Sequence, residues 1–311
     1  MLLTRLARPT TRVLHRLSST SATQPRPSGV AAALLAAKDP NFTMAPTIHS
    51  EFALNDRVGL ISGANRGLGL EMAMSLAEAG ARTIYCVDLP PHPGAEFHAV
   101  SAALRTMRLS GKLEYVSADV TQQETMWSLG KQIGEKEGRM DFCVAAAGIL
   151  REHTDCLEYP RGQMEDVMRV NVNGVLYTAQ AAGREMERFG KGGSIVLVAS
   201  MSGSLTNRGH AWLSYNTSKS AVLQMGRSMA CELGSKNIRV NTLSPGHIYT
   251  SMTAAFIDKQ PELSEKWASM NPLGRLGRPD ELRGVVTWLA SDASSYCTGS
   301  DILVNGGHHA W

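Results

Sequence analysis

The stretch VGLISGANRGLG, residues 58–69, decides the fold, because it combines a buried strand, a glycine-rich turn and the start of a helix. Its first four residues carry no polar side chain, which is typical of a strand covered by helices on both faces. An amphipathic helix is predicted over residues 68–79, and a second apolar strand follows at 83–87. The order strand, helix, strand predicts two neighbouring parallel strands.

The same alternation continues to the C-terminus. Further strands are predicted at 113–116, 142–146, 194–198, 239–243 and 302–304. Helical stretches separate them, so we expect an α/β fold with a Rossmann-like, doubly wound parallel sheet. No second composition regime and no long linker interrupts this pattern, which predicts a single domain over residues 52–311. Residues 1–50 are expected to lie outside it as a disordered N-terminal extension, made of a targeting presequence and a linker.

The glycine-rich turn predicts a dinucleotide site. Its glycines follow the pattern Gly-x-x-x-Gly-x-Gly directly after the first strand. Glycine lets the backbone turn tightly and approach a ligand, while the free amides and positive dipole end of the next helix attract a pyrophosphate. The residues of this turn expected to contact the cofactor are Gly63, Asn65, Arg66, Gly67, Leu68 and Gly69.

Two residues bear on which dinucleotide binds. Asp88 ends the second strand nineteen residues beyond Gly69. There, a carboxylate accepts hydrogen bonds from the adenosine ribose and repels a 2′-phosphate. Arg66 points the other way, because a guanidinium in the glycine turn is able to pair with a 2′-phosphate. We therefore expect NAD, with NADP as the alternative.

Tyr215 and Lys219 are spaced as an acid/base pair. Residues four apart share a helix face, so the ammonium is expected to favour the phenolate. An unperturbed tyrosine titrates near pH ~10, and a shift to neutrality needs roughly 4 kcal/mol of differential stabilisation. The spacing alone is weak evidence, because a solvated helix pair gives the same pattern.

Several motifs occur together in a fixed order. They are the glycine turn, Asp119 in the run SADV, Asn171 in VNVNG, Ser200 after a strand, Tyr215 with Lys219, and Pro245-Gly246. In this order they resemble the short-chain dehydrogenase/reductase family from Arg57 to the C-terminus. The resemblance implies an NAD(P)-dependent enzyme that moves a hydride between the nicotinamide and a secondary alcohol or ketone.

The resemblance also implies the roles of the catalytic residues. Tyr215 transfers the proton, and Ser200 hydrogen-bonds the reacting oxygen. Lys219 lowers the Tyr215 pKa and binds the nicotinamide ribose, while Asn171 holds a water that links Lys219 to solvent. The further residues implied to contact the cofactor, at the adenine and then at the nicotinamide, are Asp119, Val120, Pro245, Gly246, Ile248 and Thr250.

Two segments allow a second interpretation or depart from the family pattern. Asp119 has a second interpretation, as a cap for the next helix. The family usually carries Asn-Asn-Ala-Gly where this chain has Ala145-Ala146-Ala147-Gly148. The missing amides put cofactor affinity and local rigidity in question more than chemistry.

The loop between Ser200 and Tyr215 is expected to face the substrate. With the run ASMSG and the ending NGG, it resembles fungal polyol dehydrogenases and ketose reductases, so the implied substrate is a C5 or C6 polyol and its ketose. Ser202, Asn207 and His210 are the candidate partners for its hydroxyls, because a buried hydroxyl left unpaired costs about 1–3 kcal/mol. A polar surface loop is the alternative interpretation of these three.

Other features refine the substrate and the alternatives. The run DLP at 88–90 and the N-terminal segment are most similar to enzymes that convert D-arabinitol to D-ribulose. The competing functions are a reductase of a keto-ester, steroid or acyl-carrier substrate on the same fold, and a protein that senses NAD(P) without turnover. Residues 252–270 are expected to cover the substrate or to form a packed structural helix pair. The apolar residues at helical spacing there are Met252, Phe256, Ile257, Leu263 and Trp267.

The N-terminal 38 residues hold an unusual share of the positive charge. Their cations are Arg5, Arg8, Arg12, Arg16, Arg26 and Lys38. Spaced arginines among leucine, valine, serine and threonine are typical of an amphipathic mitochondrial presequence, so a matrix location is expected, with the cytoplasm as the alternative. Subtracting these six cations from the net charge of +3 leaves −3 for the rest, which gives no reason to expect nucleic-acid binding.

Composition and spacing exclude other classes. No apolar stretch approaches the ~18 residues of a membrane-spanning helix. The five cysteines are odd in number and far apart, and Cys86 and Cys143 fall in apolar runs, where a buried thiol is expected. Adjacent His308 and His309 do not form a coordination set, so no metal is expected. Trp311 is expected at a subunit contact, because family members commonly form homotetramers.

Overall fold

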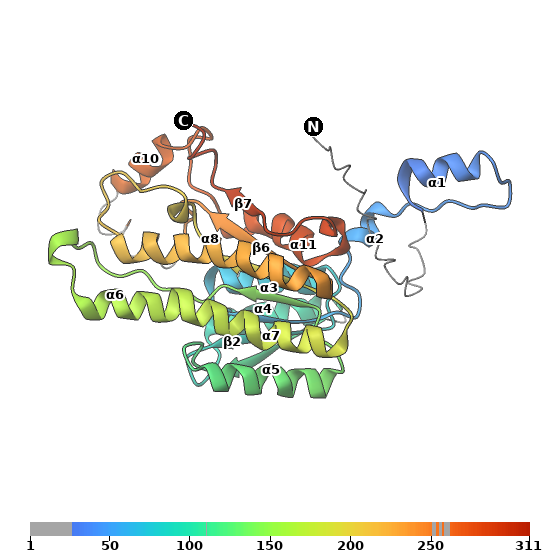
Figure 1. Cartoon of the computed structure of the whole chain (residues 1–311). Coiled ribbons are helices and arrows are strands. Elements are labelled where there is room, and N and C mark those ends of the chain that lie inside the picture. Colours follow the sequence, from blue (N-terminus) through green and yellow to red (C-terminus); the bar gives the residue numbers. More distant parts are fainter. Residues whose placement is uncertain (1–26, 110, 251–252, 255–256, 258–261) are drawn as a thin grey trace, which may run out of the picture. The chain divides into compact units, whose positions relative to one another are not determined.

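The structure is a computed structural model that describes residues 27–109, 111–250, 253–254, 257 and 262–311. The chain divides into two compact units, Met1–Thr47 and Ile48–Trp311. The described part of the first unit contains helix α1 (Gly29–Ala36). Every strand of the described chain lies in the second unit (Figure 1).

A seven-stranded sheet forms the centre of the second unit. Its strands are β1 (Val58–Ser62), β2 (Thr83–Asp88), β3 (Lys112–Ser117), β4 (Phe142–Ala145), β5 (Gly193–Val198), β6 (Ile238–Pro245) and β7 (Asp301–Val304). They lie in the order β3-β2-β1-β4-β5-β6-β7, and every neighbouring pair is parallel. The predicted Rossmann-like, doubly wound sheet is therefore confirmed.

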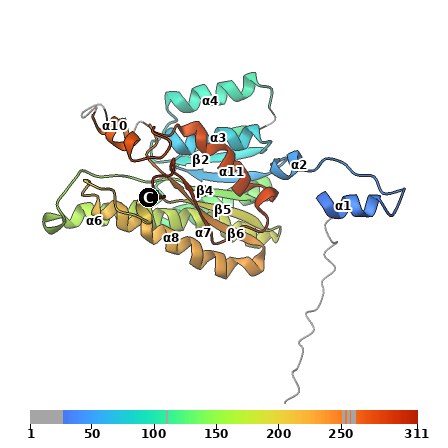
Figure 2. The same ribbon diagram turned by 90° about the horizontal axis from the view of Figure 1, so that it is seen from above.

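Helices cover both faces of the sheet (Figure 2). One layer contains α5 (Gln123–Glu137), α7 (Val175–Phe189) and α8 (Leu213–Leu233), and the other contains α3 (Gly67–Glu78), α4 (Ala95–Thr106) and α11 (Arg283–Ala290). The shorter helices are α2 (Ile48–Phe52), α6 (Arg161–Met168) and α10 (Glu262–Ser269). None of the helices in the described ranges is long and apolar enough to cross a membrane.

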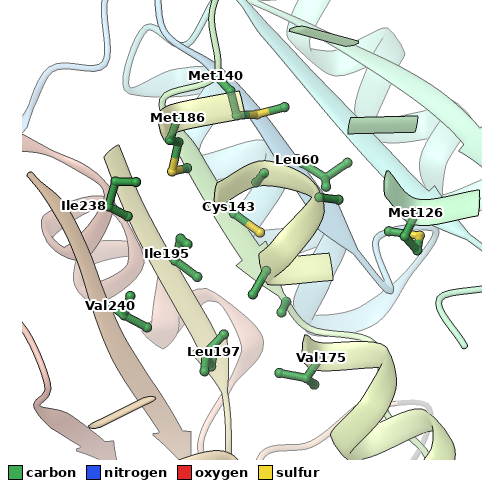
Figure 3. Packing of buried hydrophobic residues seen from close by; sticks show 14 of the residues in the cluster. Leu60, Met126, Met140, Cys143, Val175, Met186, Ile195, Leu197, Ile238 and Val240 are labelled. Atoms are coloured by element: carbon green, nitrogen blue, oxygen red, sulfur yellow. The ribbon is translucent and has the colours of Figure 1, made fainter. Parts of the chain in front are cut away.

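Buried side chains fill the space between the sheet and the layer of α5, α7 and α8. Leu60, Cys143, Ile195 and Val240 lie in register on four neighbouring strands and belong to this cluster (Figure 3). Full burial of each aliphatic side chain contributes about 1.5–3 kcal/mol. Cys143 and, on the opposite face, Cys86 are the buried thiols that the sequence predicted.

The carboxyl ends of the parallel strands meet at one edge of the sheet. β1 pairs with both β2 and β4, so the strand order reverses at β1. In doubly wound sheets, ligands bind in the crevice at such a point. The loops that leave β1, β2, β5 and β6 at this edge carry the glycine turn, Leu89, Ser200 and Gly246.

Candidate active site

Tyr215 and Lys219 lie on the same face of α8, as their spacing predicted. Lys219 is only 4% exposed, and its Nζ donates a hydrogen bond of 2.8 Å to the carbonyl of Val198 at the end of β5. The same Nζ lies 5.6 Å from the centre of the Tyr215 ring. The helix and the strand end thus place a cation and a phenol next to one another in a buried site.

Burial controls the protonation of both groups. It raises the pKa of Tyr215 above its ordinary value, and a hydrogen bond with Ser200 only partly offsets this. Burial also lowers the pKa of Lys219 to about 8. Burial is thus the largest influence on the Tyr215 pKa, and the lowering of this pKa by Lys219 stays a prediction.

Ser200 reaches Tyr215 from the loop after β5. It precedes the short turn η3 (Met201–Gly203), and its Oγ accepts a hydrogen bond of 3.2 Å from the Ser202 amide. The side chain is 8% exposed. The loop after β5 and helix α8 thus bring a hydroxyl and a phenol near one another, which is the arrangement needed to hold one substrate oxygen between them.

Asn171 lies in η2 (Arg169–Gly174), a π-helical turn between α6 and α7. Its Oδ1 accepts from the amide of Ile149 at 2.8 Å, and its Nδ2 donates to the carbonyl of Ile149 at 2.9 Å and to Ser218 Oγ at 3.1 Å. A Cβ placed on Gly148 would lie 3.4 Å from Asn171 Oδ1 and 3.6 Å from Lys219 Nζ. Asn171 therefore ties the loop after β4 to α8 beside Lys219, and its predicted water stays a prediction.

The glycine turn has the backbone shape that only glycine adopts easily. Gly63 has φ +68°, and a Cβ there would lie 2.8 Å from Ala147 Cα. A Cβ on Gly69 would lie 2.2 Å from the carbonyl oxygen of Gly63. Gly67, with φ +59°, begins α3 next to Arg66, and a Cβ there would meet no atom within 4 Å. The close approaches at Gly63 and Gly69 thus explain why glycine is needed there, and anion binding at the N-terminus of α3 stays a prediction.

Asp88 lies beside this turn. Its carboxylate accepts hydrogen bonds from the amides of Asn65 at 3.0 Å and Leu89 at 2.8 Å, and Asn65 Oδ1 in turn accepts from Gly94 at 2.8 Å. Sequence reasoning missed Glu96, whose Oε2 lies 3.5 Å from the Gly67 nitrogen. No sequence pattern marks this acid, because it reaches the glycine turn from the first turn of α4.

The segment Ala145-Ala146-Ala147-Gly148 is joined to the end of β1. The amide of Ala147 donates to Ser62 Oγ at 3.3 Å. The effect of the missing asparagine amides on cofactor affinity and local rigidity stays a prediction.

Asp119 forms the turn that leads to α5. Its Oδ1 accepts from the Thr121 amide at 2.9 Å. Burial opposes its ionisation, but hydrogen bonds from Thr121 and Gln122 outweigh burial and lower the pKa of the carboxyl. Val120 is buried against Gly174, where a Cβ would lie 2.7 Å from Val120 Cγ2. Asp119 thus stabilises the turn before α5 and does not cap the helix, whose N-cap residue is Gln122, and its contact with an adenine stays a prediction.

The loop after β6 carries the residues expected at the nicotinamide. The amide of Gly246, next to Pro245, donates to the Val304 carbonyl at 3.0 Å. Thr253 Oγ1 accepts from the Thr250 amide at 2.8 Å and donates to the Ile248 carbonyl at 2.7 Å. Sequence reasoning missed Thr253, which fixes the backbone of both predicted residues.

The three polar residues predicted for the substrate loop hydrogen-bond largely within the protein. Asn207 Nδ2 donates to Ser202 Oγ at 2.6 Å, which links Asn207 through Ser202 to Ser200. Asn207 is 3% exposed, and no donor among the described residues reaches its Oδ1. His210 Nε2 accepts from Trp267 Nε1 at 2.9 Å, so this nitrogen serves a protein contact.

The segment predicted either to cover the substrate or to form a packed helix pair is described in part, and its covering role stays a prediction. Trp267 and Leu263 lie on α10, and Trp267 clusters with Ile257, Trp212 and Tyr215. Met252 and Phe256 lie outside the described residues. The tail histidines bind amides, since His308 contacts Asn271 and His309 contacts Asn305, each at 2.9 Å. No cluster of side chains able to hold a metal ion occurs in the described part of the chain.

Comparison with known proteins identifies the family of the chain. The sequence model of a family described as enoyl-(acyl carrier protein) reductase matches residues 63–309. The chain is 37% identical to sorbose reductase of Schizosaccharomyces pombe over 83% of its own length and 98% of the relative. It is 34% identical to the ribulose-forming D-arabinitol 2-dehydrogenase of Candida tropicalis over 84% of its length and 95% of the relative.

A solved structure is also similar to this chain. Gluconate 5-dehydrogenase from Burkholderia cenocepacia, in complex with NADP and tartrate, superposes with a TM-score of 0.77 at 29% identity, over 85% of this chain and 99% of that one. The chain thus belongs to the short-chain dehydrogenase/reductase family and is an NAD(P)-dependent oxidoreductase of CH–OH groups.

Proposed function

We propose that the chain interconverts a C5 or C6 polyol and its ketose, with the pair D-arabinitol and D-ribulose as the first candidate. The observation that carries the substrate class is the buried Oδ1 of Asn207, which lacks a donor among the described residues. An unpaired buried acceptor costs about 1–3 kcal/mol, and a substrate hydroxyl would supply the missing donor. The names of the sorbose reductase and arabinitol dehydrogenase relatives support the same class.

The chain's own residues divide the proton chemistry among them. Ser200 and Tyr215 hold the reacting oxygen, and Tyr215 gives it a proton during reduction and removes one during oxidation. Asn171 fixes the loop after β4 and α8, so that Lys219 stays beside the phenol. The glycine turn and the N-terminus of α3 fit the pyrophosphate of a nicotinamide dinucleotide, whose C4 supplies or accepts the hydride.

We also propose NAD as the preferred cofactor. Asp88 stands at the end of β2, and Glu96 adds a second carboxylate near the start of α3. Two negative charges at this place disfavour a 2′-phosphate, whereas Arg66, which is exposed, favours it. The related gluconate 5-dehydrogenase structure contains NADP.

Asp88→Ala tests this preference. Loss of the carboxylate removes hydrogen bonds to the ribose and the repulsion of a 2′-phosphate, so kcat/KM with NAD should fall relative to NADP by about 10- to 100-fold. Glu96→Gln should move the ratio in the same direction by a smaller factor, because Glu96 is exposed. An unchanged ratio in Asp88→Ala would contradict the ribose role.

A substrate screen tests the proposed function as a whole. Purified chain is incubated with NAD and a panel of polyols, with NADH and ketoses, and with keto-ester and steroid ketone controls, and absorbance of the reduced cofactor is followed. Turnover restricted to polyols and ketoses supports the proposal. Turnover of the control ketones alone favours a different reductase, and cofactor binding without turnover of any compound favours a sensor.

We further propose that the chain forms a homotetramer. The support is the family resemblance and the exposed side chain of the C-terminal Trp311, which is 79% exposed. Sedimentation velocity should give a species of four times the 33.5 kDa chain mass. A monomer at micromolar concentration would overturn this assignment.

A further inference from the structure

Trp267 is the point at which three segments around the site meet. It is 1% exposed, and its indole stacks on His247 from the loop after β6, with ring centres 4.3 Å apart and planes 3° from parallel. Its Nε1 donates to His210 Nε2 at 2.9 Å, in the loop that precedes α8. Tyr215 packs against the same cluster. The indole of α10 is therefore part of the wall next to the catalytic phenol.

The hydrogen bond fixes the protonation state of His210. An indole nitrogen only donates, so His210 Nε2 must carry the lone pair, and the single ring proton lies on Nδ1. The imidazole is also stacked on Trp212, with ring centres 4.2 Å apart and planes 14° from parallel, which holds it in this orientation. Protonation of His210 would place two N–H groups opposite each other at the same contact. The contact therefore requires a neutral ring.

The surroundings make the neutral ring the stable form at neutral pH. The titratable groups that face the His210 ring or its partners are Lys266 on α10, His153, Asp155, His247 and His308. Burial, then Lys266 and His153, lowers the pKa of His210. Burial, then His308 and His210, lowers the pKa of His247 to about 3, so His247 is neutral over the pH range above that value. Asp155 lines the same 510 Å³ cavity as His210 and is the acid of this group.

We propose that His210 is a positioning residue whose neutral ring holds Trp267, and with it α10, as the wall of the substrate site. Protonation of His210 releases this wall and weakens substrate binding. The inference rests on the proposed function only in that the wall bounds the site around Tyr215. His210 thus acts on the substrate through Trp267.

His210→Gln separates this role from packing. The glutamine carbonyl accepts a hydrogen bond from the indole and does not titrate. In the unmodified protein, KM for the polyol should rise about two- to tenfold as pH falls through the His210 titration. This factor corresponds to the loss of one hydrogen bond. In His210→Gln, KM should stay constant over that range, while kcat keeps the pH profile of the parent. His153→Gln, which removes the neighbouring imidazole, should keep the parental rise in KM. The same rise in His210→Gln would overturn the proposal.

A second measurement needs no substrate. In full-length chain labelled with 5-fluorotryptophan, the fluorine signal of Trp267 is identified as the one that is missing in Trp267→Phe. This signal should shift as His210 titrates, and it should stay fixed over the same pH range in His210→Gln. If His210→Gln does not fold, the His210 pKa is measured instead in Trp267→Phe from the His210 ring proton signal. Loss of a hydrogen bond to the neutral ring should raise this pKa. An unchanged His210 pKa in that variant would overturn the proposal. The fluorine and ring-proton measurements use no substrate, so their outcome is independent of the polyol screen.

Discussion

Among single residues, Tyr215 and Lys219 show how strongly burial decides acid/base chemistry. Their sequence spacing predicts a lowered phenol pKa, yet desolvation raises the Tyr215 pKa and lowers that of Lys219 to about 8. The spacing specifies that the groups are neighbours, whereas their solvation depends on the strands and helices that close over them. A phenol that stays protonated at neutral pH is ready to donate in reduction and must first lose its proton in oxidation.

This state predicts the pH dependence of oxidation. Below the raised Tyr215 pKa, the phenolate fraction grows tenfold for each pH unit, so log kcat/KM for polyol oxidation should rise by about one per pH unit up to at least the ordinary tyrosine range. Initial rates measured over a pH series would check this. A plateau near neutrality would mean that the free protein already holds a phenolate.

Residue by residue, sequence reasoning found the partners that motifs mark and missed those that no motif marks. Ser200, Tyr215 and Lys219 come together as predicted. Sequence reasoning missed Glu96, because its contact with the glycine turn depends on how α4 folds back on α3. It also missed Thr253, only five residues from Ile248, because no motif marks this threonine. Sequence reasoning assigned His210 to the substrate, and the structure instead directs its Nε2 at Trp267.

The elements of the site could be predicted where hydrophobic periodicity is strong. Each predicted strand overlaps a strand of the sheet, since continuous apolar runs between amphipathic helices leave little choice of structure. The π-helical turn Arg169–Gly174 gave no such signal, although it positions Asn171. An extra residue in a helical turn is specified by contacts with the loop after β4, which periodicity does not record.

Two glycines in first helical turns form a matched test of the cofactor element. Gly69→Ala in α3 would push a Cβ to 2.2 Å from the Gly63 carbonyl oxygen, so it should lower the melting temperature and weaken dinucleotide binding by at least about tenfold. Gly284→Ala in α11 meets no atom within 4 Å and should stabilise the protein by about 0.5–1 kcal/mol. Thermal unfolding and cofactor titration would check both. Equal behaviour of the two variants would contradict the close approach at Gly69.

At the scale of the whole molecule, the catalytic unit and the N-terminal segment are expected to be separable. The second compact unit, Ile48–Trp311, contains the sheet and every candidate site residue. We propose that the segment before Met44 directs import into the mitochondrial matrix, because its six cations before Asp39 alternate with apolar and hydroxyl residues.

A chain that starts at Met44 tests this division. It should unfold at the same temperature as the full-length protein, since the sheet and its helices are retained. Fused to a fluorescent protein in fungal cells, the full-length chain should enter mitochondria, and the shortened chain should stay in the cytoplasm. Import of the shortened chain would mean that the targeting signal lies after Met44. A lower melting temperature would mean that residues before Met44 stabilise the catalytic unit.

The most direct test of the central claim compares Tyr215→Phe with the unmodified protein. The substitution removes one hydroxyl from a buried ring, so cofactor binding and the melting temperature should be kept. Turnover of the best polyol and its ketose should fall by at least about 10²- to 10⁴-fold, because the proton donor is lost. Near-normal turnover in Tyr215→Phe, with the cofactor bound, would contradict the account.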